Sequence, residues 1–309
     1  MKKGKGSKPK DQHYVPACYL REFVDPFVPE RHNPYVWIFD RDGKNRRNKA
    51  PENILKVNEL YTLQISGQEN DYIVEESLQK LETQYATIFR NRIKKKQPLD
   101  KEEHILLSTF SYAMLHRTLK FKDNMERFLD NLVTHVEDME AIHGNTSQKT
   151  STEMKEFRKN AHSLSLVRML PKMGAFLAQM SVAFLCTPKV GARFITSDNP
   201  CFVFNSDVHW QKLLGPGISQ ENAQILMPLS PEITLCLSWS NLKGYINISN
   251  SRVHEINRMV RAHSYNHFVS QVSKTNLIWF SPLPLDLFFL GKFVRIKLQN
   301  LLADHFRVD

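Results

Sequence analysis

The stretch FITSDNP at residues 194–200 marks the point where the hydrophobic period of this 309-residue chain changes. Before it, apolar residues recur every three or four positions, as in helices, and after it they alternate, as in strands. We expect strands at residues 193–197 and 201–205, joined by a turn at Asp198, Asn199 and Pro200, because Asp and Asn cap turns with their own side chains. Further strands are expected at residues 224–229 and 233–239, followed by a helix at residues 251–271 and a short strand at residues 277–280.

Upstream of this stretch the pattern is helical. From residue 71 to 96, one apolar stripe steps by 4, 3, 4 and 3 through Val74, Leu78, Leu81, Tyr85 and Ile88. Such a stripe predicts an amphipathic helix. Asp100, with Glu103 three places on, begins a second helix that we expect to run to about residue 139. A third is expected at residues 151–170, and the apolar run at residues 173–186 reads as a buried helix after Pro171.

The N-terminal part predicts strands and turns. Val15 precedes a proline, so residues 13–16 begin extended and a short helix follows to residue 23. Residues 35–40 alternate as a strand, the Asp42–Gly43 pair is a turn signal, and a return strand near Asn45 closes a hairpin. Residues 59–63 read as another strand. We therefore predict an α+β fold, with a central helical bundle packed on a mixed β-sheet built from N- and C-terminal strands. One domain is expected over residues 11–309.

The formal net charge of +10 points to polyanionic partners. Residues 1–10 hold five lysines and no acid, and a segment of this composition is expected to be disordered. A second basic cluster lies at residues 90–96. These clusters favour RNA or DNA as a partner, or else they are a solubilising tail and a helix end whose cations suit the helix dipole.

Several classes of protein are disfavoured. No apolar stretch is long enough to span a bilayer, and no signal peptide is visible, so we expect no membrane association and a cytoplasmic location. The four cysteines form no CxxC pair and are expected to be free thiols. Phosphate-binding glycine loops, HExxH and GxSxG are missing from the sequence, so no cofactor and no metal is predicted.

Six motifs together resemble the bacterial family catalogued as domain of unknown function 4238. They are HYVP at residues 13–16 running into YLREF at 19–23, VWIF at 36–39, HRT at 116–118, ITSDNP at 195–200, MPLSP at 227–231, and Asn257 in a late helix. The resemblance covers about residues 11–271 and implies kinship without an activity. Members often have proline after the Arg-Thr pair, where this chain has Leu119. We therefore expect the helix to continue past Thr118.

Arg117 is the most informative polar residue. It lies on the core-facing stripe of its helix with Leu106, Phe110 and Ala113, and a buried guanidinium needs an anionic partner. It is either half of a buried ion pair, for which Asp198 is the expected carboxylate, or an anion clamp in a cleft. His116 lies on a neighbouring stripe, either as a core histidine or as a catalytic group.

The two main motifs supply the other candidates. His13, beside Tyr14, has the near-neutral pKa that general acid or base catalysis needs, or it is a structural histidine. Arg21 suits a phosphate group or a salt bridge. Asp198 is either a functional carboxylate at a strand end or a turn cap.

Asn257 lies on an apolar helix face, where its amide needs partners. It makes a core hydrogen bond or lines a site, and Asn199 is a further supporting residue. His263 and His267, four apart on the expected helix, could share a metal, but no third ligand is identifiable.

Our leading hypothesis is a metal-independent enzyme that cleaves RNA phosphodiesters. His13, His116 and Asp198 would be catalytic, Arg21 and Arg117 would hold phosphate, and the two motifs would meet in space. The alternative is a non-catalytic nucleic-acid-binding module in which the same polar residues form a core network. A defence or toxin-like role would suit either, although no residue argues for one.

Overall fold

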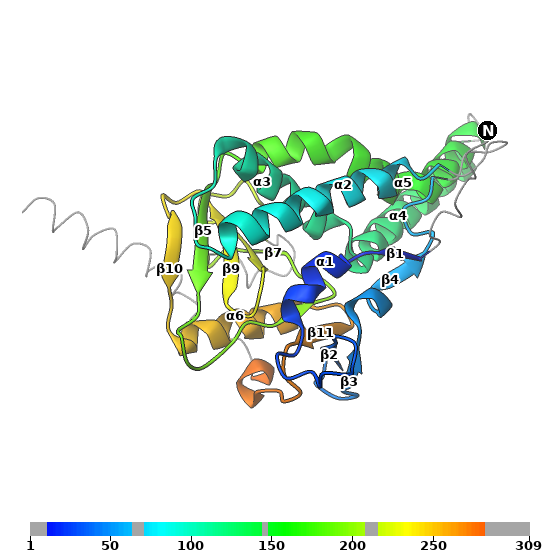
Figure 1. Cartoon of the computed structure of the whole chain (residues 1–309). Coiled ribbons are helices and arrows are strands. Elements are labelled where there is room, and N and C mark those ends of the chain that lie inside the picture. The colour runs from blue at the N-terminus through cyan, green and yellow to red at the C-terminus, as the bar shows by residue number, and fades with distance from the viewer. Residues whose placement is uncertain (1–10, 64–70, 144–147, 208–215, 282–309) are drawn as a thin grey trace, which may run out of the picture. The chain divides into compact units, whose positions relative to one another are not determined.

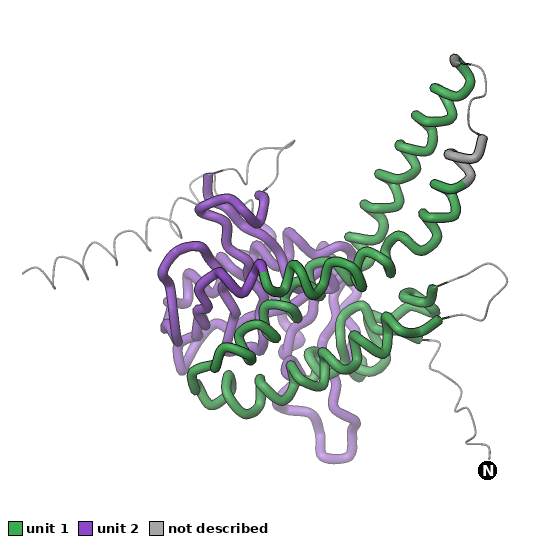
Figure 2. The backbone as a smooth tube through the Cα atoms, turned by 90° about the horizontal axis from the view of Figure 1, so that it is seen from above, with its two compact units in different colours: residues 1–21, 49–175 green, residues 22–48, 176–309 purple. Residues whose placement is uncertain are grey.

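The computed structural model describes residues 11–63, 71–143, 148–207 and 216–281, and its fold is α+β, as predicted (Figure 1). The expected basic tail at residues 1–10 lies outside this range. The chain divides into two compact units: unit 1 holds residues 1–21 and 49–175, and unit 2 holds residues 22–48 and 176–309 (Figure 2). One domain over residues 11–309 stays a prediction.

Unit 1 is mainly helical. A small antiparallel pair joins β1 (Asp11–His13) to β4 (Lys56–Asn58). Its helices are α1 (Ala17–Leu20), the 3₁₀ turn η2 (Pro51–Asn53), α2 (Ile73–Ile88) with a π turn η3 (Phe89–Ile93), α3 (Lys101–His116), α4 (Leu119–His143) and α5 (Gln148–Leu177). The strand expected at residues 59–63 is wrong, because residues 59–61 form a turn and the strand lies just before it.

The predicted stripe of α2 and the predicted start of α3 are confirmed, whereas α5 begins at Gln148 rather than at residue 151. In α2 the stripe residues Val74, Leu78, Tyr85 and Ile88 are buried. At the start of α3, the Glu103 backbone N–H donates to the Asp100 carboxylate at 2.8 Å, and the Asp100 N–H donates to the Glu103 carboxylate at 3.0 Å. This reciprocal capping box satisfies two backbone donors that the helix cannot use.

The prediction that the helix continues past Thr118 is wrong. The chain breaks between α3 and α4, although Leu119 replaces the proline. Nε2 of His162 lies 2.8 Å from the carbonyl oxygen of His116, and the Tyr61 hydroxyl donates to the carbonyl oxygen of Arg117 at 2.6 Å. Two side chains from elsewhere in unit 1 thus bind the carbonyls that a continuing helix would have used.

Unit 2 contains two sheets and the helix α6 (Asn250–His263). One sheet has the strand order β10-β5-β9-β8-β7, in which β10 pairs with β5 in parallel and the remaining pairs are antiparallel. Its strands are β5 (Ser181–Cys186), β7 (Phe202–Phe204), β8 (Gln224–Pro228), β9 (Ile233–Ser238) and β10 (Gly244–Asn247). The 3₁₀ turns η1 (Arg21–Phe23) and η4 (Leu277–Phe280) complete the described elements, and η4 replaces the strand expected at residues 277–280.

The other sheet combines strands from both ends of the sequence, as predicted. Its order is β3-β2-β11-β6, from β2 (Val36–Asp40), β3 (Arg47–Lys49), β6 (Thr196–Ser197) and β11 (His267–Ser270). Phe39 of β2 stacks on Phe268 of β11 with ring centroids 5.0 Å apart, within the core that also covers the apolar face of α6. The β2–β3 turn contains Gly43 at φ +84°, a conformation that favours glycine.

Two helix predictions in the C-terminal half are wrong. Residues 173–186 divide between the end of α5 and strand β5, because an apolar run buried on both faces does not distinguish a helix from a strand. The helix expected to reach residue 271 ends at His263, and β11 follows. Through the described part of the chain, no helix is both long and apolar enough to cross a membrane.

Candidate functional site

Arg117 is buried, as its position in the sequence predicts, with 1% of its surface exposed. Its Nη1 donates to Oε1 of Glu82 at 2.7 Å, and its Nη2 donates to the carbonyl oxygen of His13. The guanidinium carbon lies 5.7 Å from the centre of the Tyr61 ring. Burial opposes the charge, but Glu82 and Tyr61 outweigh it and raise the pKa of Arg117. The ion-pair alternative is confirmed, with Glu82 rather than Asp198 as the carboxylate.

His13 is half-buried at the end of β1. Burial, only partly opposed by the Glu82 carboxylate, lowers the pKa of His13. Its ring is therefore neutral near pH 7, and within the described residues its Nε2 has no hydrogen-bond partner. The next residue, Tyr14, is buried, and its backbone N–H donates to the carbonyl oxygen of Leu55 at 2.9 Å.

Arg21 forms an exposed ion pair. Its Nε and Nη2 both lie 2.8 Å from Oε1 of Glu52. Burial works against the Glu52 charge, but a backbone N–H and Arg21 hold the pKa of Glu52 below its ordinary value. A phosphate group at Arg21 would have to displace this carboxylate, so the contact favours the salt-bridge alternative.

His116 lies in an aromatic cluster. Its ring stacks on Tyr112 with centroids 4.0 Å apart and meets the edge of Phe121 at 4.5 Å. Its Nδ1 lies 3.0 Å from the Tyr112 carbonyl oxygen. Burial lowers the pKa of His116, although that hydrogen bond opposes the shift. This environment favours a core histidine.

Asp198 acts as a turn cap in unit 2. Its carboxylate accepts backbone N–H groups from Tyr265 at 2.7 Å, Asn266 at 2.6 Å and His267 at 2.8 Å. These bonds draw the chain out of the helical conformation between α6 and β11. Burial raises the pKa of Asp198, against the effect of the three N–H donors.

The two asparagines attach the FITSDNP segment to α6. Asn199 donates its amide to the carbonyl oxygen of His263 at 3.0 Å. The Asn257 amide accepts the Ile195 N–H at 3.0 Å and donates to the Arg193 carbonyl oxygen at 2.7 Å. Both contacts favour the structural alternative for these residues.

The predicted site residues fall in both units. His13, Tyr14, Arg21, His116 and Arg117 belong to unit 1, and Arg117 joins the first motif to the helix motif through the His13 carbonyl. The others, Asp198, Asn199 and Asn257, belong to unit 2. A site shared by His13 and Asp198 stays a prediction.

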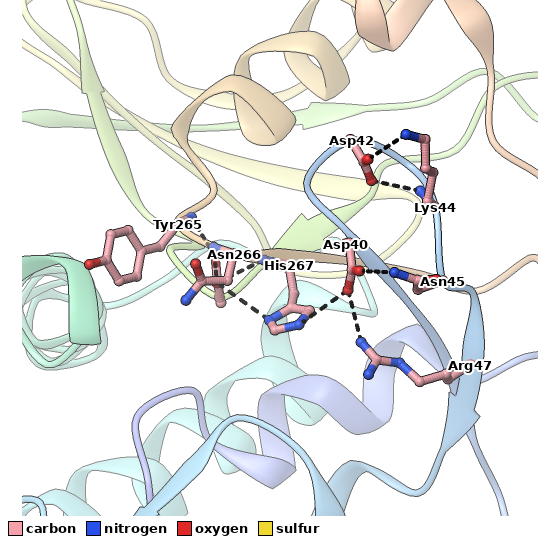
Figure 3. A network of polar contacts seen from close by, with 9 residues as sticks. Asp40, Asp42, Lys44, Asn45, Arg47, Tyr265, Asn266 and His267 are labelled. Atoms are coloured by element: carbon pink, nitrogen blue, oxygen red, sulfur yellow. Dashed lines mark hydrogen bonds and ion pairs between the residues drawn. The ribbon is translucent and has the colours of Figure 1, made fainter.

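The environment of His267, which Figure 3 shows, was not predicted from the sequence. Its Nε2 lies 3.5 Å from Oδ1 of Asp40, its Nδ1 lies 3.9 Å from Oδ2 of Asp198, and its side chain is 29% exposed. Asp40 also accepts from Arg47 at 2.9 Å and from Asn45 at 2.6 Å. The register of β11 against β2 places His267 opposite Asp40.

The helix expected at residues 251–271 hid this pairing. His263 ends α6 and His267 begins β11, so the shared helix face assumed for them is wrong. The sequence signal for the change from helix to strand was the apolar pair at residues 268–269, which lies next to residues that disfavour a helix.

Two arginines of the β2–β3 hairpin contact carbonyl groups rather than carboxylates. Arg41 donates to the carbonyl oxygen of Ala262 at 2.9 Å, and Arg46 donates to that of Ser273 at 3.0 Å. The Arg46 guanidinium also lies 5.3 Å from the centre of the Trp37 ring. Both arginines are exposed, and neither forms an ion pair with a carboxylate of the described chain.

A third guanidinium lies near that of Arg41. Arg261, in the last turn of α6, lies 5.3 Å from the centre of the Phe280 ring. Its burial, and then the nearby charge of Arg41, lower the pKa of Arg261. In the residues that the structure describes, its Nε has no hydrogen-bond partner. We call Arg41, Arg46 and Arg261, with the carboxylate-paired Lys44 and Arg47, the basic hairpin surface.

Comparison with known proteins identifies a family but no activity. No curated protein and no solved structure matches the chain. A family model described as protein of unknown function (DUF4238) matches residues 11–275, which is most of the sequence and the range in which the six motifs lie. The resemblance seen in those motifs is therefore kinship, and the chain belongs to the DUF4238 family.

Proposed function

We propose that this protein binds single-stranded nucleic acid through the basic hairpin surface. The observation that carries the proposal is the presence of three guanidinium groups, those of Arg41, Arg46 and Arg261, without a carboxylate partner in the described residues. Like charges on one surface, such as those of Arg41 and Arg261, favour the binding of an anion there. Phosphate groups of a nucleic acid have the charge and the geometry that arginine binds best.

The aromatic rings support a single strand as the ligand. Arg46 lies over Trp37 and Arg261 lies over Phe280, so each pair presents a flat cation next to an apolar ring. Unpaired bases stack on aromatic rings and on guanidinium planes, whereas the bases of a duplex are stacked on each other. The surface thus offers both backbone and base contacts to an unpaired strand.

The contacts of the sequence-predicted residues also support the binding alternative. Arg117 is held by Glu82, and Asp198 accepts three backbone N–H groups. A side chain whose hydrogen-bonding atoms already have partners within the chain has few atoms left to bind a substrate. Arg117, Asp198 and Asn257 are thus bound by groups of the folded chain itself, and the cations of unit 2 supply the surface for a ligand.

Removing two guanidiniums should weaken RNA binding and its dependence on salt. The slope of log affinity against log salt concentration should become less negative by about 1.4 in the double variant Arg41→Gln with Arg46→Gln. Each contact with a phosphate of a single strand contributes about −0.7 to this slope. Fluorescence anisotropy of a labelled unstructured RNA, measured over a salt series, gives this slope. Arg158→Gln, an exposed arginine of α5, is the matched control and should leave it unchanged. An equal slope in all three proteins would rule out this surface.

Cleavage of RNA phosphodiesters is a second candidate, and the pair His267–Asp40 favours it. A partly exposed imidazole beside a carboxylate can take a proton from a ribose 2′-hydroxyl as that oxygen attacks the adjacent phosphorus. The imidazolium that forms, or a water molecule that it protonates, then returns this proton to the departing 5′-oxygen and leaves a 2′,3′-cyclic phosphate. Arg47 donates a hydrogen bond to Asp40, and its guanidinium could contact a phosphate group that lies beside the Asp40 carboxylate.

The cleavage hypothesis predicts that His267→Gln lowers the rate about 100-fold or more. Labelled RNA incubated in excess chelator and resolved on a gel measures the rate. His13→Gln tests the sequence hypothesis in parallel, because it alone should abolish activity if His13 is the acid or base. If the wild-type chain cleaves no RNA while it binds RNA, the enzyme candidate fails and the binding proposal stands.

A further inference from the structure

Helix α4 has two apolar stripes, and the described residues of unit 1 cover one of them. Figure 2 shows α4 and α5 as two neighbouring green helices of that unit. Lys155 of α5 pairs with Glu137 of α4 at 2.6 Å, and Arg158 pairs with Asp130 at 2.7 Å. Val133, on the side of these ion pairs, is buried. This stripe fixes which face of α4 is turned to α5.

The second stripe has a coiled-coil period and is exposed, apart from its half-buried first residue, Met125. We call it the outer stripe, and its residues step by 3, 4, 3, 4 and 3 through Met125, Phe128, Leu132, His135, Met139 and Ile142. Phe128, Met139 and Ile142 are 62%, 54% and 77% exposed. Single exposed apolar residues are ordinary, but a regular stripe of them marks a surface that binds something. A spacing of 3.5 residues is the one by which a helix binds a second helix.

The charges beside the outer stripe fit a second copy of this helix. Arg127 and Asp138 lie on the same flank, eleven positions apart, with Leu132 near their midpoint. Neither forms an ion pair in the described residues. If two copies pack antiparallel about a twofold axis at Leu132, Arg127 of each faces Asp138 of the other. In a parallel pair this flank would instead face the opposite flank of the partner, so Arg127 would not meet Asp138.

We propose that the chain forms an antiparallel homodimer through the outer stripe of α4. The stripe spans 18 residues, a helix length of about 27 Å. That is a small interface, so the dimer dissociates reversibly at about micromolar concentration. The twofold brings Leu132 against Leu132 of the partner and Met125 against its Met139. The proposal does not depend on nucleic-acid binding.

Sedimentation velocity of the full chain over a wide concentration range tests the dimer. We expect a monomer–dimer equilibrium, and Leu132→Glu should weaken it at least about tenfold because two carboxylates would face each other at the twofold. Phe157→Glu, at an apolar residue of α5 that is 48% exposed against 37% for Leu132, is the control and should leave the equilibrium unchanged. A chain that is monomeric throughout, or a dimer that tolerates Leu132→Glu, would overturn the proposal.

Two further variants test the orientation. Arg127→Glu should weaken the dimer, and adding Asp138→Arg should restore it, because the swapped charges again face each other. Leu132→Cys should cross-link to its own copy under mild oxidation, whereas Met125→Cys should not, since only residues at the twofold meet themselves. The wild-type chain, with Cys18 half-buried and three cysteines buried, gives the background. Equal cross-linking of both variants would exclude the antiparallel arrangement.

Discussion

Arg117→Met should lower the free energy of unfolding by about 3–5 kcal/mol, the cost of breaking a buried ion pair from one side. The substitution leaves the Glu82 carboxylate, whose side chain is only 20% exposed, without its cation. The carbonyl oxygen of His13 also loses its donor. Methionine fills most of the space of the arginine stem, so the loss reflects charge rather than a cavity. Urea unfolding at neutral pH measures it.

A double variant separates the ion pair from other effects. Glu82→Gln in the Arg117→Met background removes the stranded charge and should recover part of the lost stability. Arg21→Met is the matched control, because the exposed pair with Glu52 contributes at most about 1 kcal/mol. If Arg117→Met is as stable as the wild type, or if Glu82→Gln brings no recovery, the pair does not stabilise unit 1 as we infer.

Acidification should destabilise unit 1 through His162. Burial lowers the pKa of His162 from 6.5 to about 4, so the folded chain keeps this ring neutral while the unfolded chain protonates it earlier. The stability that this ring contributes is complete above about pH 6.5 and is lost as the pH falls toward about 4. A shift of this size corresponds to about 3 kcal/mol. Urea unfolding at a series of pH values measures the slope.

We attribute the expected slope of the free energy of unfolding against pH to the His162 side chain, so a substitution at this residue should reduce the slope. His162→Phe keeps an aromatic ring against Tyr61 and Phe121 but does not titrate. At neutral pH its free energy of unfolding should be about 1 kcal/mol lower than that of the wild type, because the hydrogen bond to the His116 carbonyl is lost. Its free energy of unfolding should also fall less steeply as the pH decreases. His32→Gln, an exposed histidine of unit 2, should decline like the wild type. Equal slopes for wild type and His162→Phe would contradict this origin.

The parts of the fold that could be predicted depend on neighbouring residues. The α2 stripe and the Asp100 capping box involve positions three or four apart, and both are confirmed. The failures occur where a distant residue acts on the backbone. Tyr61 binds the carbonyl of Arg117, the residue that follows α3, and Asp198 binds three N–H groups between α6 and the start of β11. No local pattern reveals such contacts.

The candidate residues show the same limit. The period of α3 predicted that Arg117 is buried, but its partner Glu82 lies 35 positions away on another helix. His267 was assigned to a helix, and only the register of β11 against β2 brings it to Asp40. The sequence thus identified polar residues with unusual surroundings. It could not tell which contacts satisfy them.

The pairing of β2 with β11 has a consequence for synthesis. His267 pairs with Asp40, so 267 − 40 = 227 positions separate the two partners. At the usual rate of translation, β2 leaves the ribosome about 10 to 45 s before its partner strand exists. During that time one edge of the β2–β3 hairpin has no strand to bind, which is the state in which nascent chains aggregate or recruit chaperones. A nascent chain stalled before β11 should therefore be the most chaperone-dependent form of this protein.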